Sequence, residues 1–118
     1  MKENREADLV LVDHMLSCVA AINEFLAGDP SRYLASRLIR DATLRNLQTL
    51  TESSQRLSAE LKQAHPQVPW KKLAGFRNLL VHDYLGGIDD QSVVLVLSNE
   101  LQDLRTTLEQ IRRDLSST

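Results

Sequence analysis

Apolar residues recur every three or four positions along most of the chain, and this spacing is typical of one face of an α-helix. Residues 6–27 show it first. Their apolar positions are Leu9, Val12, Leu16, Val19 and Ile22, followed by Phe25 or Leu26. The Gly-Asp-Pro-Ser sequence at 28–31 then combines a helix stop, a proline and a side chain able to cap a new helix. The pattern predicts a first helix over 6–27 and a turn after it.

The next stretch, residues 33–64, continues the same period, and no glycine or proline interrupts it. We therefore expect one long helix here. The Thr-Glu-Ser-Ser sequence at 51–54 has weak helix propensity, and we expect the helix to bend there. Residues 65–70 contain two prolines, which predict a connection rather than a helix. We expect Pro69 to be the first residue of the next helix and Trp70 to anchor the connection.

Two more helices are expected in the last third of the chain. One covers 70–84 and stops at the glycine pair 86–87, and the other covers 92–116 with an aspartate at 89 or 90 as its N-cap. The run 93–97 is rich in β-branched residues and would suit a buried strand. Because no other segment offers a strand to pair with it, we interpret it as a buried helix that continues into, or kinks against, the rest of 92–116. Residues 1–118 are thus predicted to form one all-α domain, a bundle of four or five helices.

Composition and charge narrow the class of protein only slightly. The formal net charge is −2, so any nucleic-acid site needs a local basic patch. The cations that could form it are Lys71, Lys72, Arg37 and Arg40, although a solvated charged face is the commoner role of any one of them. Cys18 is the only cysteine, which leaves no disulfide within the chain, and we expect it to be buried. The polar first residues and the lack of an apolar run of membrane-spanning length predict a cytoplasmic protein with no membrane partner.

Three polar residues of the expected helix 70–84 could carry chemistry: Arg77, Asn78 and His82. An imidazole can take a proton from a ribose 2′-hydroxyl or give one to a leaving oxygen, and a guanidinium can neutralise charge on a phosphate. Asn78 and His82 are four residues apart, so they share a face, and Asn78 could orient the imidazole or the phosphate. Arg77 and His82 are separated by about 140° around the helix. From this spacing alone, a surface cation and a helix-capping histidine remain the commoner interpretation.

The histidines outside this segment suggest no metal site. His14 and His65 have no second histidine or cysteine at the spacing that metal ligands require. We therefore expect neither a metal nor a cofactor.

The segment around these residues resembles the HepT-like ribonuclease toxins of the HEPN superfamily. The family signature Arg-x4-His-x-Tyr is matched by Arg77, His82 and Tyr84. Around it, Val-Pro-Trp at 68–70, Gly-Phe-Arg-Asn at 75–78 and Gly-Ile-Asp at 87–89 also match the family pattern. Glu52 is retained where the family carries a Gly-Glu-Ala element, although both of its neighbours differ.

The resemblance implies an all-α HEPN-like bundle that forms a homodimer, with the motif helices near the dimer cleft. It implies a metal-independent endoribonuclease, the toxin of a type VII (HepT/MntA) toxin–antitoxin system, with Arg77 and His82 as catalytic residues and Asn78 in support. The implied partners are RNA and an MntA-like nucleotidyltransferase antitoxin that adenylylates Tyr84. The chain and the antitoxin could also assemble into a higher oligomer. No DNA partner is expected. Adenylylation would put a bulky anion beside the catalytic pair and repel the RNA backbone.

Two other interpretations stay open. The chain could be a non-catalytic helical partner of a nucleotidyltransferase, with Arg77 and His82 serving that contact. It could also be a purely structural helical dimerisation module. Tyr84 itself could simply pack its ring near the helix end, with its hydroxyl pointing outward.

Overall fold

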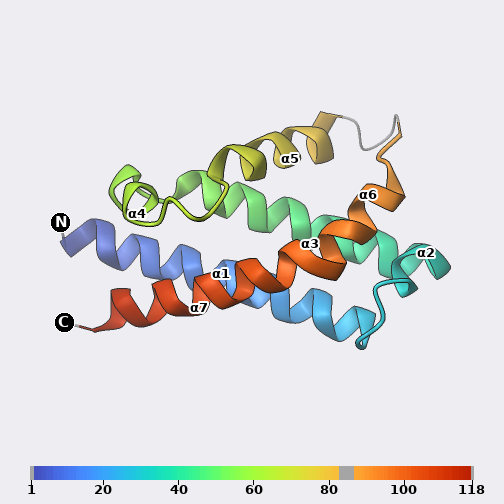
Figure 1. Cartoon of the computed structure of the whole chain (residues 1–118), viewed down its shortest axis with the longest axis horizontal. Coiled ribbons are helices and arrows are strands. Elements are labelled where there is room, and N and C mark those ends of the chain that lie inside the picture. Colours follow the sequence, from blue (N-terminus) through green and yellow to red (C-terminus); the bar gives the residue numbers. More distant parts are fainter. Residues whose placement is uncertain (1, 83–86, 118) are drawn as a thin grey trace.

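A computed structural model describes residues 2–82 and 87–117 of the chain, and within these residues it contains helices and no strand (Figure 1). The elements are α1 (Lys2–Leu26), α2 (Arg32–Ala35), α3 (Arg37–Arg56), α4 (Ala59–Ala64), α5 (Trp70–His82), α6 (Asp90–Leu95), a π-helical turn η1 (Val96–Glu100) and α7 (Leu101–Ser116). The all-α prediction is confirmed. Helices α1, α3, α5 and α7 are the long members of the bundle, and α2 and α4 are short connecting helices.

The bundle is held together by a core at the centre of α1, α3 and α7. Helix α3 packs against α1 on one side and α5 on the other, and α1 also packs against α7. The fully buried side chains of this core include Val12, Met15, Val19, Ile22, Leu47, Leu50, Leu108 and Ile111. The start of α1 is joined to the end of α7 by Arg5, whose Nη2 donates to the carbonyl oxygens of Asp114 and Leu115, at 3.1 Å each.

Helix α1 confirms the first predicted helix, and it is more apolar than we expected. Its segment Asn4–Leu26 has a mean hydropathy of 1.6 and is long and apolar enough, by length and composition alone, to cross a membrane. The expectation that no segment reaches that length is therefore wrong. Here the apolar side of α1 lies in the core, where Val12, Met15 and Val19 are 0 % exposed. Core packing accounts for part of the hydropathy of this helix, since 33% of its apolar window is buried.

The single long helix predicted over 33–64 is wrong, and the first break comes at Ser36. Its backbone is extended, with φ −140° and ψ 123°, and its hydroxyl oxygen accepts a hydrogen bond from Ile39 N to cap α3. The preceding Tyr33 is 0 % exposed, and its hydroxyl donates to Asp90 Oδ1 at 2.9 Å. Burying Tyr33 against the start of α6 thus separates the short α2 from α3.

The second break comes at Leu57 and Ser58, not at the predicted bend over 51–54. Helix α3 runs straight through the hydroxyl-rich stretch, where Thr51 Oγ1 donates to Gln48 O and Ser54 Oγ to Thr51 O. The hydroxyls are satisfied within the helix, so they do not disrupt it. Leu57 then turns to extended backbone, and Ser58 caps α4 by accepting from Leu61 N.

The connection at 65–70 is confirmed, and the indole of Trp70 anchors it. Trp70 Nε1 donates to Lys62 O at 3.2 Å and to His65 O at 3.0 Å, which ties the start of α5 to the end of α4. Pro69 stands one position earlier than predicted: its carbonyl accepts from Leu73 N at 3.1 Å, so it precedes the helix rather than opening it. The described part of α5 ends at His82, and the expected residues 83 and 84 lie outside the described residues.

The ambiguous run 93–97 is helical, as predicted, and contains the kink. Asp89 caps α6 by accepting from Gln91 N. The backbone N–H of Leu101 then donates to Val96 O, five residues back, which makes η1 a π turn. Val93, Leu97 and Leu101 are all buried at steps of four residues. Because an α-helical turn holds about 3.6 residues, such steps drift around a regular helix, and the wider turn keeps all three in the core.

Candidate functional site

Helix α5 presents one face to α3 and leaves the opposite face open. Phe76 is half-buried and Leu80 is 1 % exposed, and both belong to or pack against the core. Gly75, Asn78 and His82 follow at helical spacing on the other side, and all three are exposed. Helix α5 runs antiparallel to α3, so its C-terminal end and the N-terminal end of α3 point the same way (Figure 1).

Arg77 lies at the edge between these two faces and is half-buried. Its Nη1 donates to Asn78 Oδ1 at 3.3 Å, while its buried Nε has no hydrogen-bond partner within the described residues. The hydrogen bond described for Asn78 thus goes to the guanidinium and not, as its spacing suggested, to His82. Asn78 is itself exposed, and its amide group also carries a donor nitrogen.

His82 is exposed at the last described position of α5. Its place at the C-terminal end of a helix also suits a cation, because the helix dipole is negative there. Tyr84, the candidate for modification, lies outside the described residues, so the structure gives no position for its hydroxyl relative to His82.

The four candidate RNA-binding cations fall into two groups at opposite ends of α5. Lys71 and Lys72 are exposed in its first turn, ten or eleven residues before His82, which corresponds to about 15 Å or slightly more along the helix axis. Arg37 and Arg40 belong to the first turn of α3, at the His82 end of the pair. Arg37 Nε is 3.6 Å from Asp41 Oδ2, an exposed pair, and Arg40 is half-buried.

Glu52 lies away from this face, between α1 and α3. It is half-buried and accepts from Gln48 Nε2 at 3.0 Å. Together with His14 and Arg56 it lines a shallow cavity of about 440 Å³. Glu52 therefore belongs to the packing between α1 and α3 and does not lie beside Arg77.

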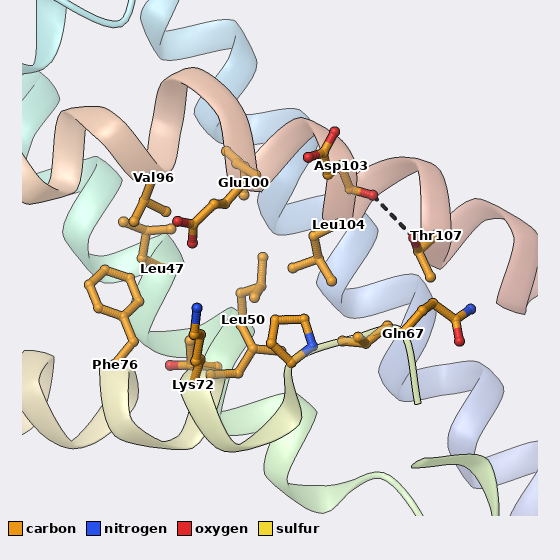
Figure 2. A pocket seen from close by; sticks show the side chains of 15 residues that line it. Leu47, Leu50, Gln67, Lys72, Phe76, Val96, Glu100, Asp103, Leu104 and Thr107 are labelled. Carbon is orange, nitrogen blue, oxygen red and sulfur yellow. Dashed lines mark hydrogen bonds between the residues drawn. The ribbon is translucent and has the colours of Figure 1, made fainter. Parts of the chain in front are cut away.

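Sequence reasoning missed a groove between α5 and the η1–α7 segment, which Figure 2 shows from close by. Its volume is about 430 Å³, and its lining is mostly leucine, valine and phenylalanine. The four-residue steps through 93–101 were the only signal of it, because they imply a wider turn at this wall. Within residues 2–82 and 87–117, no three His, Cys, Asp or Glu side chains gather as metal ligands would.

Comparison with known proteins assigns this arrangement to a family. Residues 15–111 match the family described as ribonuclease HepT-like. A candidate RNase of Methanocaldococcus jannaschii is 34% identical over 58 residues, which cover 49% of this chain and 53% of that protein. A second candidate RNase from the same organism is 28% identical over 87 residues, 74% of each chain. A candidate ribonuclease HepT of Thermococcus cleftensis is 26% identical over 81 residues, 69% of this chain and 73% of that protein. No solved structure matches the chain.

Proposed function

The chain belongs to the ribonuclease HepT-like family, and from this premise we propose that it is a metal-independent endoribonuclease acting through Arg77 and His82. One observation carries the proposal. An exposed imidazole and a guanidinium, the latter hydrogen-bonded to Asn78, occupy one end of the same helix. The family match and the relatives described as candidate RNases support RNA as the substrate.

The proposed reaction is attack of a ribose 2′-hydroxyl on the adjacent phosphorus. The 2′-oxygen forms a bond to phosphorus, and the bond from phosphorus to the 5′-oxygen breaks. One His82 imidazole accepts the proton of the 2′-hydroxyl, and a protonated His82 from a second subunit gives a proton to the 5′-oxygen. Arg77 neutralises the charge that gathers on the phosphate oxygens. The products are a 2′,3′-cyclic phosphate and a 5′-hydroxyl.

The site as proposed needs a homodimer. Arg77 and His82 point about 140° apart around α5, so one helix cannot direct both at a single phosphate without help from the long arginine stem. The open face of α5 is suited to a second copy. At Gly75, nothing lies within 4 Å of where a Cβ would be, and Leu79 and Val81 are 38% and 36% exposed. Pairing two such helices would gather two arginines and two histidines in one cleft.

The RNA backbone would be held by cations around this cleft. Arg37 and Arg40 belong to the start of α3, at the same end of the antiparallel α3–α5 pair as His82, and Lys71 and Lys72 would extend the positive surface along α5. Such local charge offsets the formal net charge of −2, which by itself does not attract a polyanion.

The protein is further proposed to be the cytoplasmic toxin of a type VII toxin–antitoxin system, neutralised by an MntA-like nucleotidyltransferase that adenylylates Tyr84. The family match supports this part, and it follows the resemblance of the Arg-x4-His-x-Tyr segment. The added phosphodiester would repel the RNA backbone from the catalytic pair. The competing function is a non-catalytic helical partner of the same kind of enzyme, which would bind it tightly and cleave nothing.

Product analysis on the purified chain tests the chemistry. His82→Ala and Arg77→Ala are expected to lower RNA cleavage by a factor of about 10² or more while the dimer persists. Arg77→Lys should restore little, because an ammonium lacks the planar fork. His14→Ala and Arg112→Ala replace exposed side chains of the same types elsewhere and serve as matched controls. Strict dependence of the wild type on added Mg²⁺, or 5′-phosphate product ends, would contradict the mechanism.

Intact-mass measurement tests the regulation separately. The chain is produced alone and together with the nucleotidyltransferase encoded beside it. AMP-sized additions that disappear in Tyr84→Phe are expected only in the second case. Additions elsewhere, or none at all in a chain whose nuclease activity is still suppressed, would assign neutralisation to binding instead.

A further inference from the structure

The helix bundle is closed on three sides and open on the fourth. Helices α1 and α3, α3 and α5, and α1 and α7 pack extensively against each other, whereas α5 and α7 do not. Between these two antiparallel helices lies the groove of about 430 Å³, with α3 as its floor (Figures 1 and 2). A volume of this size is in the range of sites that hold a ligand or an inserted side-chain cluster.

The walls of the groove are apolar and only partly covered. Leu47 and Leu50 of α3 form the floor. Phe76 from α5 lies opposite Val96, and Leu104 lies further along the wall that carries Val96; these three side chains are half-buried (Figure 2). A partner that removes this apolar surface from water gains favourable free energy of binding. The wall on the α7 side begins in the π turn, a feature often found at functional sites.

The length of the groove fits a short helix. Its lining runs from Pro69 to Phe76 along one wall and from Val96 to Thr107 along the other. At about 1.5 Å per residue these distances are roughly 11 and 17 Å, or two to three turns of an α-helix. A helix laid between α5 and α7, on α3, would complete the fourth side of the bundle.

The two rims of the groove carry charges of opposite sign. Lys72 stands on the α5 rim, and Glu100 of η1 points toward it from the opposite wall (Figure 2). Asp103 lies further along that wall, with its carboxylate directed away from α5, and all three side chains are exposed. A helix that fits must therefore carry an apolar stripe flanked by an acidic edge toward Lys72 and a basic edge toward the two carboxylates. Because the two rims carry opposite charges, they also determine the direction in which a bound helix runs. Turning the helix end to end would place its acidic edge beside the carboxylates and its basic edge beside Lys72.

We propose that this groove is the docking site for an amphipathic helix of a protein partner, with one acidic and one basic edge beside its apolar stripe. The groove does not include Arg77, Asn78 or His82, although Lys72, one of the proposed RNA-binding cations, stands on its rim. Lys72 and Phe76 lie on the groove side of α5, whereas Gly75, Asn78 and His82 occupy the face assigned to the second copy of the chain. A dimer formed through that face leaves the groove accessible. The proposal does not depend on ribonuclease activity.

Three synthetic peptides test it against the full-length chain. Each is a 14-residue, fluorescein-labelled helix with the same leucine stripe, and its two edges are Glu and Lys, Lys and Lys, or Glu and Glu. Fluorescence anisotropy is expected to give the Glu/Lys peptide a Kd about three- to tenfold lower than either of the others, as two exposed ion pairs can provide. Leu104→Ala, which removes apolar surface from the wall, is expected to weaken all three.

Rim reversal supplies the matched control, because it changes only exposed side chains. Lys72→Glu is expected to move the preference to the Lys/Lys peptide. Glu100→Lys together with Asp103→Lys is expected to move it to the Glu/Glu peptide. No binding by any peptide at millimolar concentration, or a preference unchanged by these reversals, would overturn the proposal. Peptide binding that splits a dimer of the chain in sedimentation equilibrium would also overturn it, because the groove would then be the interface between copies.

Discussion

The buried carboxylate of Asp8 in α1 holds Ser58, fifty residues later, by two hydrogen bonds. Ser58 N donates to Asp8 Oδ1 at 2.9 Å, and Ser58 Oγ donates to Asp8 Oδ2 at 2.6 Å. Asp8 is only 4% exposed, and Ser58 is the N-cap of α4. The position at which the chain leaves α3 and enters α4 is therefore fixed by a residue of another helix.

Asp8→Ala is expected to lower the free energy of unfolding by about 2–3 kcal/mol, because two hydrogen bonds to a buried charged group are lost. Urea unfolding followed by circular dichroism measures it. Asp13→Ala is the control on the same helix: its ion pair with Arg112 joins two roughly half-exposed side chains and contributes about 1 kcal/mol or less. Equal losses for the two variants would mean that Asp8 does not fix this junction.

The Asp8–Ser58 contact also explains which part of the fold the sequence could not predict. Local patterns were sufficient for α1, for α5 and for the proline-containing connection between α4 and α5. They failed over 33–64, where neither break contains glycine or proline. At each serine the break coincides with a tertiary contact: the nearby Tyr33 is buried and bonded to Asp90, and Asp8 accepts from Ser58. A serine alone is compatible with either outcome.

Thr43→Val is expected to raise the free energy of unfolding by about 1 kcal/mol. Thr43 is 0 % exposed, and its hydroxyl has no hydrogen-bond partner within the described residues. Valine has nearly the same shape and removes the cost of burying that hydroxyl. Thr51→Val is the matched control, since Thr51 is 1% exposed but donates to Gln48 O, and this change should destabilise. Destabilisation by both variants would indicate that the hydroxyl of Thr43 has a partner.

Gly75→Ala separates the stability of the subunit from that of the proposed dimer. Nothing within 4 Å would meet the added Cβ, so the subunit should gain about 0.5–1 kcal/mol from the better helix propensity of alanine. If the open face of α5 contacts a second copy closely, the same methyl group should weaken dimerisation. Thermal unfolding and sedimentation equilibrium measure the two effects. An unchanged dimer constant would argue against close approach of the two α5 helices at this residue.

Asp89 makes the start of α6 sensitive to acid. The hydroxyl of Ser92, followed by the backbone N–H of Gln91, donates to the carboxylate and holds the pKa of Asp89 below its ordinary value. Its contribution is therefore complete at neutral pH and is lost as the pH falls below about 4 and through the lowered pKa. Asp89→Ala should lower the unfolding temperature at pH 7 and have less effect near pH 2.5. An equal effect at both values would rule out the charged form as the stabilising one.

The sequence proposed the residues of the candidate site, but it could not predict their hydrogen bonds. The spacing of Arg77, Asn78 and His82 and their family resemblance selected the helix and its open face. Spacing could not decide that Asn78 would accept from its immediate neighbour instead of the imidazole four residues on. The groove was out of reach for a similar reason. The four-residue spacing of apolar positions over 93–101 indicates a wider turn at one wall, but it does not predict the distance between α5 and α7 that opens the groove.

Because the bundle is open between α5 and α7, α5 packs extensively against fewer long helices than α1 and α3 do. Within the described residues, α1 packs extensively against two long helices, whereas α5 packs extensively against α3 alone. Its backbone amides should accordingly exchange with solvent through a local opening that leaves α1, α3 and α7 intact, at a lower free energy than global unfolding. The helix that carries Arg77 and His82 is thus the one most readily rigidified by whatever binds beside it. Order at the proposed nuclease face and occupancy of the neighbouring groove would then be thermodynamically linked, each favouring the other.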